Sequence, residues 1–390
     1  MKDLYQKPYL KILLLSIFTF LLFSYSSELK SKEKEPKKKS MYINYTVNIA
    51  DEEMEDNNHI QFLEEFFSKE WEWDAFFPML YQSDYMYVGF QDIYNNQKSY
   101  LYYKPNLIAL TKLSNKKTLA KVAFATPDNN DFTSIMGIYD FLIIDTEDGL
   151  RLGSPFEYNL QNWNKLESNG NNYYTPKGRT FNLENISEMN NFNIKLSEYF
   201  DIPIIPFHYC VGRDIIEIKK LQGIDFNAYM YSNDGLGGEA YPWYNFIFSG
   251  NNSEYYPHEL VHLYTYQLFP DKHSSMDEAL AVYLGGALDK TFEDYMPALK
   301  AYILEHEVDL FDYAFQYIDK YITIKQKPIG DLILAFLCYY TEKEYDKEVL
   351  FELMNSGRTY AELLVVLEES VGLNKENFNT IIKQELISDF

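Results

Sequence analysis

The sequence predicts an α+β protein built from two domains. Its 390 residues exceed the usual size of one domain and are enough for two hydrophobic cores. Aromatic and β-branched runs dominate residues 41–176, which is typical of strands, whereas apolar residues recur with helical spacing from Phe292 to the C-terminus. We therefore expect an α+β accessory domain at 41–176 and a second domain at 185–390 that ends in helices.

The first 27 residues have the three regions of a secretory signal peptide. Lysines at positions 2, 7 and 11 lead into an apolar run from Ile12 to Phe23, which Ser24 and Ser26 follow. The run is short of the roughly 20 residues that span a bilayer, and small residues suit a signal peptidase. We expect cleavage of 1–27 and export to the periplasm, the cell envelope or the medium. An uncleaved anchor is the alternative, and only then is membrane attachment expected.

Residues 28–40 form a run of lysine and glutamate with almost no apolar side chains to bury, which predicts a disordered charged linker. Residues 1–39 hold nine lysines and four acidic residues, so they carry +5 of a total net charge of −23, and the rest of the chain carries −28. A folded part this acidic repels phosphate backbones, so we expect no nucleic-acid partner.

The accessory domain is expected to place one helix against a curved antiparallel sheet. The helix is His59 to Phe67, where apolar residues follow helical spacing. No catalytic constellation is visible in this part of the sequence, and binding of a substrate or partner is its alternative role. Asparagines and glycines from Asn164 to Arg179 predict a linker to the second domain. Strands are expected at 41–47, 99–103, 119–125 and 137–144.

The second domain begins with a predicted buried strand at 202–211 and a helix at 213–221. A glycine-rich stretch at 234–238 lacks a following Lys-Ser or Lys-Thr, so it predicts a turn and not a phosphate loop, and a strand at 244–249 follows. The chain has two cysteines, Cys210 in a predicted strand and Cys338 in a predicted helix, which we expect to be buried free thiols. Helices are expected near 294–305, 309–320, 330–343, 347–355, 359–370 and 374–386.

The segment Tyr256-Pro-His-Glu-Leu-Val-His-Leu263 carries the most specific pattern, H-E-x-x-H at the start of a helix. His258 and His262 are four residues apart and therefore share one helical face, from which both rings can bind one tetrahedral zinc ion. Glu259 would then reach a zinc-bound water and act as its general base. The alternative is a buried helix whose histidines only form hydrogen bonds in the core.

A zinc site needs a third protein ligand. A metzincin would have a glycine and a histidine downstream of the motif where this chain has Thr265 and Leu268, so that subclass is excluded. His273, Asp277 and Glu278 are the next candidates. A helix is expected from about Met276 to Gly285, capped by Ser274 or Ser275, with Glu278 in its first turns facing the metal.

With these motifs, residues 185–390 resemble the gluzincin metallopeptidases, the peptidase MA-like clan that includes thermolysin and aminopeptidase N. In that family a glutamate on a second helix is the third zinc ligand, and the matching run here is Asp277-Glu-Ala-Leu-Ala281. The resemblance implies a small sheet, a helical C-terminal part and a peptide or protein substrate. It implies His258, His262 and Glu278 as Zn²⁺ ligands and Glu259 as the base. Asp277 is then either a supporting residue behind the ligands or a solvated acid, and His273 a spare ligand.

The chain departs from this family at two points. It has no Gly-x-Met-Glu-Asn motif, the amino-terminus anchor of aminopeptidase N relatives. The stretch 327–334, where those relatives have an oxyanion-stabilising tyrosine, contains no tyrosine. The oxyanion donor therefore stays open among Tyr283, Tyr321, Tyr339 and Tyr340.

In gluzincins the strand that precedes the zinc helix lies at the edge of the sheet and pairs with the substrate backbone. Residues 244–249 are either that edge strand or an ordinary sheet strand.

The function expected from the sequence is that of an exported zinc-dependent metallopeptidase. The alternative is a non-catalytic envelope binding or scaffold protein that keeps a metallopeptidase-like fold. The intact set of two histidines and two glutamates favours the enzyme, because a fold kept for binding does not need the base, whereas the missing tyrosine favours the scaffold.

Overall fold

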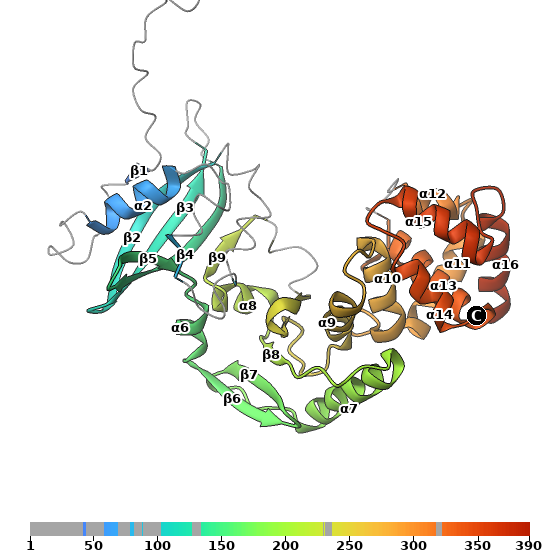
Figure 1. Cartoon of the computed structure of the whole chain (residues 1–390), viewed down its shortest axis with the longest axis horizontal. Coiled ribbons are helices and arrows are strands. Elements are labelled where there is room, and N and C mark those ends of the chain that lie inside the picture. Colours follow the sequence, from blue (N-terminus) through green and yellow to red (C-terminus); the bar gives the residue numbers. More distant parts are fainter. Residues whose placement is uncertain are drawn as a thin grey trace, which may run out of the picture.

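The computed structural model describes residues 42–43, 58–68, 79–81, 88, 103–126, 134–228, 230, 236–316 and 322–390. The expected signal peptide at 1–27 and the charged linker at 28–40 lie outside these ranges. The fold is α+β, as predicted, with a β-sheet at one end of the chain and a bundle of helices at the other (Figure 1). Among the described residues no helix is both long and apolar enough to cross a membrane.

A six-stranded sheet forms the N-terminal lobe, in the order β1-β2-β3-β4-β5, with β9 also paired to β4. Helix α2 (Asn58–Ser68) packs on it through Phe67, whose ring centroid lies 5.8 Å from that of Phe124 and 5.6 Å from that of Phe141. This confirms the predicted helix on an antiparallel sheet. The strands are β1 (Tyr42–Ile43), β2 (Lys104–Ser114), β3 (Lys117–Ala125), β4 (Ile135–Thr146), β5 (Gly149–Gly153) and β9 (Ile224–Asn227).

The predicted strands at 119–125 and 137–144 are confirmed as β3 and β4. Only two residues of the strand expected at 41–47 are described, and they pair parallel to β2. The strand expected at 99–103 falls mainly outside the described residues, and the observed strand starts at Lys104.

The segment Asn164–Arg179 is not a linker, so that prediction was wrong. It contains two antiparallel strands, β6 (Trp163–Ser168) and β7 (Asn171–Pro176), joined at Asn169 and Gly170. Both joining residues have positive φ, 49° and 78°. An Asn-Gly pair favours the tight turn of a β-hairpin, because both central residues of that turn need left-handed backbone. The polar composition thus reflects a hairpin turn.

This hairpin belongs to a second, five-stranded sheet in the order β10-β11-β8-β7-β6. Strand β11 (Phe246–Ser249) lies between two neighbours, so of the two roles considered for 244–249 it has that of an ordinary sheet strand, and β10 (Gly238–Tyr241) is the edge. Strand β8 is His208–Val211, shorter than the predicted 202–211. Pro203 and Pro206 lack the N–H donors that a ladder requires, which explains the later start.

Helices cover both faces of the second sheet. Helix α8 (Ile215–Leu221), as predicted, packs on one face together with α6 (Phe156–Leu160), and α7 (Leu183–Phe200) and α9 cover the other. The sequence analysis contained no prediction for α7. Its start is capped by Asn182, whose side chain accepts hydrogen bonds from Glu184 N and Asn185 N. Strand β9 follows α8 and returns to the first sheet, so the two sheets alternate along the chain.

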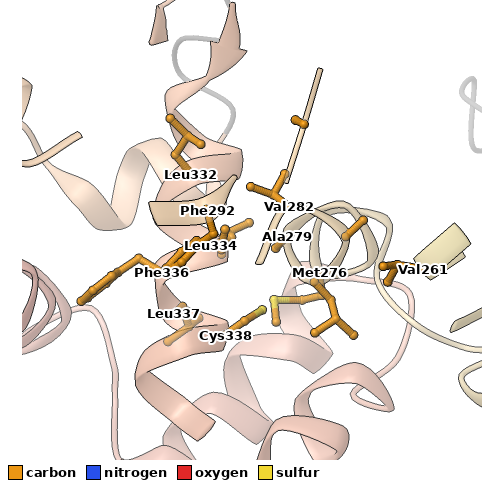
Figure 2. Close-up of a cluster of buried hydrophobic side chains, with 14 of the residues drawn as sticks. Val261, Met276, Ala279, Val282, Phe292, Leu332, Leu334, Phe336, Leu337 and Cys338 are labelled. Atoms are coloured by element: carbon orange, nitrogen blue, oxygen red, sulfur yellow. The ribbon is translucent and has the colours of Figure 1, made fainter. Parts of the chain in front are cut away.

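The C-terminal part is a helical bundle, as predicted. Figure 2 shows the apolar core on which it is built, with Met276 and Ala279 of α10 facing Leu334 and Cys338 of α13. Both cysteines are buried and free, which confirms that prediction. The helices are α9 (Pro257–Leu268), α10 (Ser274–Gly285), α11 (Phe292–Glu305), α12 (Leu310–Phe315), α13 (Ile329–Glu344), α14 (Lys347–Met354), α15 (Tyr360–Val366) and α16 (Phe378–Asp389).

Candidate metal site

Helix α9 carries the H-E-x-x-H pattern at its start. Pro257 occupies the first helical turn, where its missing N–H removes no hydrogen bond. His258 and His262 project from one face, and their Nε2 atoms lie 3.3 Å apart. His258 is only 3% exposed. The helical spacing thus brings the two imidazoles to one point, as the sequence predicts.

Helix α10 begins differently from the prediction. Its N-cap is His273, whose Nδ1 accepts a hydrogen bond from Ser275 N at 3.1 Å, and Ser274 and Ser275 are already helical. An imidazole can cap here because its neutral form keeps one bare nitrogen as an acceptor. Burial lowers the pKa of His273, which favours that neutral form. His273 is therefore a capping residue, and the structure does not bring it to the metal-ligand group.

Glu278 lies one turn into α10 and faces both histidines. Its Oε1 is 3.2 Å from His258 Nε2, and its Oε2 is 3.6 Å from His262 Nε2. One ligand atom from each residue falls within a group no more than 4.8 Å across. The two helices approach closely because Gly285 has no side chain: a Cβ there would lie 2.7 Å from His258 N.

The outer nitrogen of each histidine has its own acceptor. His258 Nδ1 lies 2.7 Å from the carbonyl oxygen of Gly286, and His262 Nδ1 lies 3.2 Å from Asp277 Oδ2. A neutral imidazole with its proton on Nδ1 has Nε2 free to bind a metal. Burial lowers the pKa of His262, but Asp277, Glu278 and Glu259 outweigh it and raise that pKa well above its usual value. Asp277 is itself held by Thr265 Oγ1, which donates to its Oδ1 at 2.5 Å. Asp277 is thus a supporting residue behind His262 and not a solvated acid.

Glu259, the expected base, is 6% exposed. Burial raises its pKa, against the opposing effect of the neighbouring histidines. The edge strand β10 comes close to it, since a Cβ on Gly238 would lie 2.9 Å from Glu259 Cγ and 2.6 Å from Tyr256 Cε1. The Tyr256 ring in turn stacks near His258, with centroids 5.7 Å apart and planes inclined by 16°. The base is therefore enclosed between α9 and the edge strand.

Lys327 is a site residue that the sequence analysis missed. Its ammonium group contacts the Glu278 carboxylate, and its Nζ lies 3.6 Å from Asp331 Oδ2. Burial opposes its charge, but Glu278 and Asp331 outweigh this and raise the pKa of Lys327. No motif in the sequence identifies it, because it is 49 residues from Glu278 along the chain.

Of the tyrosines considered as oxyanion donors, Tyr283 lines the cavity beside the site. Tyr283 and Tyr339 pack against each other, with ring centroids 6.2 Å apart, and against Phe292. Tyr340 is 8% exposed and packs near Tyr345, and Tyr321 falls outside the described residues.

A cavity of about 800 Å³ adjoins the site. Its lining includes Pro257 and Gly286, which neighbour the histidine contacts, and Gln326, which precedes Lys327. The cavity does not include the predicted ligands themselves, and at Gly286 it borders the residue whose carbonyl oxygen faces the outer nitrogen of His258.

The donor set fits a zinc ion. Two imidazole nitrogens and one carboxylate are a common set for catalytic zinc, with one position left for water or substrate. Without the histidines, the four carboxylates and two ammonium groups around the ligands carry a formal charge of −2, which a divalent cation would balance. The six charged groups are Glu259, Asp277, Glu278, Asp331, Lys272 and Lys327.

Neither a scan against protein-family models nor a search of curated proteins finds a match to this chain.

Proposed function

We propose that the chain is a zinc-dependent metallopeptidase of gluzincin type. His258, His262 and Glu278 would bind the zinc ion, and Glu259 would be the general base. The observation that carries this proposal is the convergence of two Nε2 atoms and a carboxylate while each outer nitrogen faces an acceptor. A merely structural histidine pair has no need for two bare nitrogens to face each other in a buried site.

The catalytic role of the chain centres on Glu259. A bound zinc ion supplies Lewis-acid chemistry, lowering the pKa of a water molecule and polarising a carbonyl group. Glu259 takes a proton from the attacking water as the water oxygen bonds to the carbonyl carbon. Burial raises the pKa of Glu259 towards the working range of a proton carrier, which suits it to accept and release that proton.

The remaining steps conserve atoms and charge. The carbonyl π electrons move to its oxygen as the tetrahedral species forms. When that species collapses, the C–N bond breaks, its electron pair goes to nitrogen, and Glu259 returns its proton to the leaving amine. The products are a carboxylic acid and an amine, and Glu259 ends as a carboxylate. The adjoining cavity provides room for the flanking parts of a peptide.

We further propose that the protein acts outside the cytoplasm. This rests on the signal-peptide pattern of residues 1–27 and on the strongly acidic remainder, which disfavours nucleic acid. Membrane attachment is expected only if that segment stays uncleaved.

The deciding experiment measures metal content in protein purified without chelator. We expect one zinc per chain in the wild type and in Glu259→Gln, and none in Glu278→Ala, because removing one of three ligands weakens the site strongly. A peptide library should then be cleaved by the wild type only. Absence of stoichiometric zinc in the wild type would contradict the proposal.

A non-catalytic binding protein is the second candidate, and one contact favours it. The ammonium of Lys327 already neutralises Glu278, so the carboxylate has a cationic partner within the chain. A scaffold of this kind predicts that Glu259→Gln changes no measurable property except local stability. Stoichiometric zinc together with cleavage that depends on Glu259 would exclude it.

A further inference from the structure

Lys327 is held at the site by a rigid turn. It follows directly on the two-residue loop Lys325–Gln326 between β12 (Thr323–Ile324) and β13 (Lys327–Pro328). Both loop residues have positive φ, 49° and 70°, as the tight turn of a hairpin requires, although neither is glycine. Side chains in left-handed backbone are strained, and such strain collects where a functional group must be positioned.

The turn is anchored to neighbouring elements. Lys325 Nζ donates to the carbonyl oxygen of Asp294 in α11 at 2.5 Å. Ile329 N, at the start of α13, donates to Ile322 O at 3.0 Å. Lys327 thus starts from a backbone position that is anchored on both sides, and its ammonium group is held by the ion pairs to Glu278 and Asp331.

The ammonium has donor capacity beyond its ion pairs. Its contacts among the described residues are with Glu278 and Asp331, and an ammonium group carries three N–H donors. The Lys327 side chain is 13% exposed, so it lies at the site and yet retains some access to solvent. One donor can therefore face an incoming oxygen atom.

The Lys327 cation is compensated by the carboxylates of Glu278 and Asp331, and a bound metal ion would compete with it for the first of them. Lys327 would repel the zinc ion that Glu278 binds, and burying its charge carries a desolvation cost. The reaction offers a further compensation, because the carbonyl oxygen gains a full negative charge as the tetrahedral species forms. Preorganised donors aimed at such an oxygen are among the largest contributions to catalysis.

We propose that Lys327 is a catalytic residue whose ammonium group donates a hydrogen bond to the oxyanion formed from the scissile carbonyl. The inference rests on the proposed function. As water adds to the carbonyl carbon, the π electron pair moves to oxygen and Lys327 stabilises it. On collapse, the pair re-forms the C=O bond and the C–N bond breaks. Lys327 keeps its proton throughout, and Glu259 carries the transferred one.

The test compares Lys327→Met, which keeps the length of the side chain and removes its charge, with Lys327→Arg, which keeps the charge. Lys300→Met is the matched control, because it removes a lysine from α11 whose Nζ binds Ile387 O at the surface. Three properties are measured in each: zinc content, kinetics on a peptide that the wild type cleaves, and inhibition by a phosphinic peptide, whose anionic tetrahedral centre mimics the transition state. Circular dichroism checks that each variant is folded.

We expect Lys327→Met to keep one zinc per chain and to lose about 10²–10³-fold in kcat with KM changed by only a few-fold. Phosphinic peptide binding should weaken by a similar factor. Lys327→Arg should recover part of both losses, and Lys300→Met should match the wild type.

Three outcomes overturn the inference while leaving the proposed function intact. The first is undiminished kcat in Lys327→Met when the wild type is active. The second is loss of zinc in that variant, which makes Lys327 a support for Glu278. The third is a loss confined to KM for peptides with a free C-terminal carboxylate and absent for amidated ones, which makes it a substrate anchor. A wild type with neither zinc nor hydrolysis overturns the proposed function itself, and the role of Lys327 with it.

Discussion

The N-terminal sheet and the α9–α10 pair each hold a cluster of charged side chains, and only the second cluster includes residues that are almost fully buried. In the sheet, the core is apolar and aromatic, and the charged cluster lies on Lys121, whose ammonium contacts Asp140 and Asp225. Those three side chains are 28%, 14% and 38% exposed, so water shares in their solvation. Between α9 and α10, His258 and Glu259 are only 3% and 6% exposed, whereas the side chains of Asp277 and Glu278 are 20% and 32% exposed, as in the sheet cluster.

This difference teaches where to look for function. Partly exposed ion pairs contribute little and need no special explanation. Charges held away from water are costly, so a cluster of them signals a bound ion or a reaction that uses them. The sheet cluster is self-contained, with one ammonium between two carboxylates, whereas the helical cluster, without its histidines, has a formal charge of −2 and converging ligand atoms.

The largest expected effect is on catalytic activity, which should depend on the α9–α10 cluster and not on the sheet cluster. Glu259→Gln should lower kcat at least about 10³-fold, or about 4 kcal/mol of transition-state stabilisation, because glutamine cannot accept the proton. Asp140→Asn, in the sheet cluster, should leave kcat unchanged. Initial rates on a cleaved peptide measure both, and residual activity above a tenth of wild type in Glu259→Gln would show that another group is the base.

We expect zinc to stabilise the α9–α10 pair and not the N-terminal sheet. A ligand that binds only the folded state, at 100 times its dissociation constant, adds about 2.7 kcal/mol to the free energy of unfolding. Hydrogen exchange with and without zinc should show slower exchange in α9 and α10 and no change in β3 and β4. Equal protection of both regions would mean that the two regions unfold as one cooperative unit, and EDTA reversal is the control.

Replacing one glycine by alanine in each region tests how tightly the α9–α10 pair and the N-terminal sheet are packed. In Gly285→Ala the new Cβ would lie 2.7 Å from His258 N, a backbone atom, so α9 and α10 must separate. In Gly153→Ala it would meet Ile144 Cδ1 at 2.9 Å, the mobile end of a side chain. We expect losses of about 1–3 kcal/mol for the first and under about 1 kcal/mol for the second. Denaturant unfolding measures the stability of both variants, and equal losses of stability would contradict the expected difference in packing. Only Gly285→Ala should also weaken zinc binding.

The smallest expected effect is the pH dependence of the stability that Lys121 contributes in the sheet cluster. Burial lowers the pKa of Lys121, but hydrogen bonds to Asp140 and Asp225 outweigh it and raise the folded-state pKa above 10.5. Its stabilising contribution is therefore complete below pH 10.5 and disappears as the pH rises through the folded-state value. Lys121→Met should cost about 1 kcal/mol or less at pH 8, since the pair is partly exposed. Urea unfolding of both proteins at pH 8 and 11 tests this, and a constant deficit would contradict it.

The parts of the site that lie on single helices could be predicted because their spacing is local. A period of 3.6 residues brings His258 and His262 together whatever the rest of the chain does, and the same period marked α10 and the C-terminal helices. Errors came where a local signal has two meanings. Asn169 and Gly170 suit a linker or a hairpin, and a histidine before two serines can cap a helix in their place.

Spacing along the chain was enough to predict the C-terminal helices and the meeting of His258 with His262 beside Glu259, since each depends on residues within one or two turns of each other. Packing between elements brought Glu278 to both histidines, placed Asp277 behind one of them and left β10 as the edge strand. It also brought Lys327 to Glu278 from 49 residues away. Such contacts depend on how helices and hairpins pack against one another. They join residues that are far apart along the chain, so no repeating spacing in the sequence predicts them.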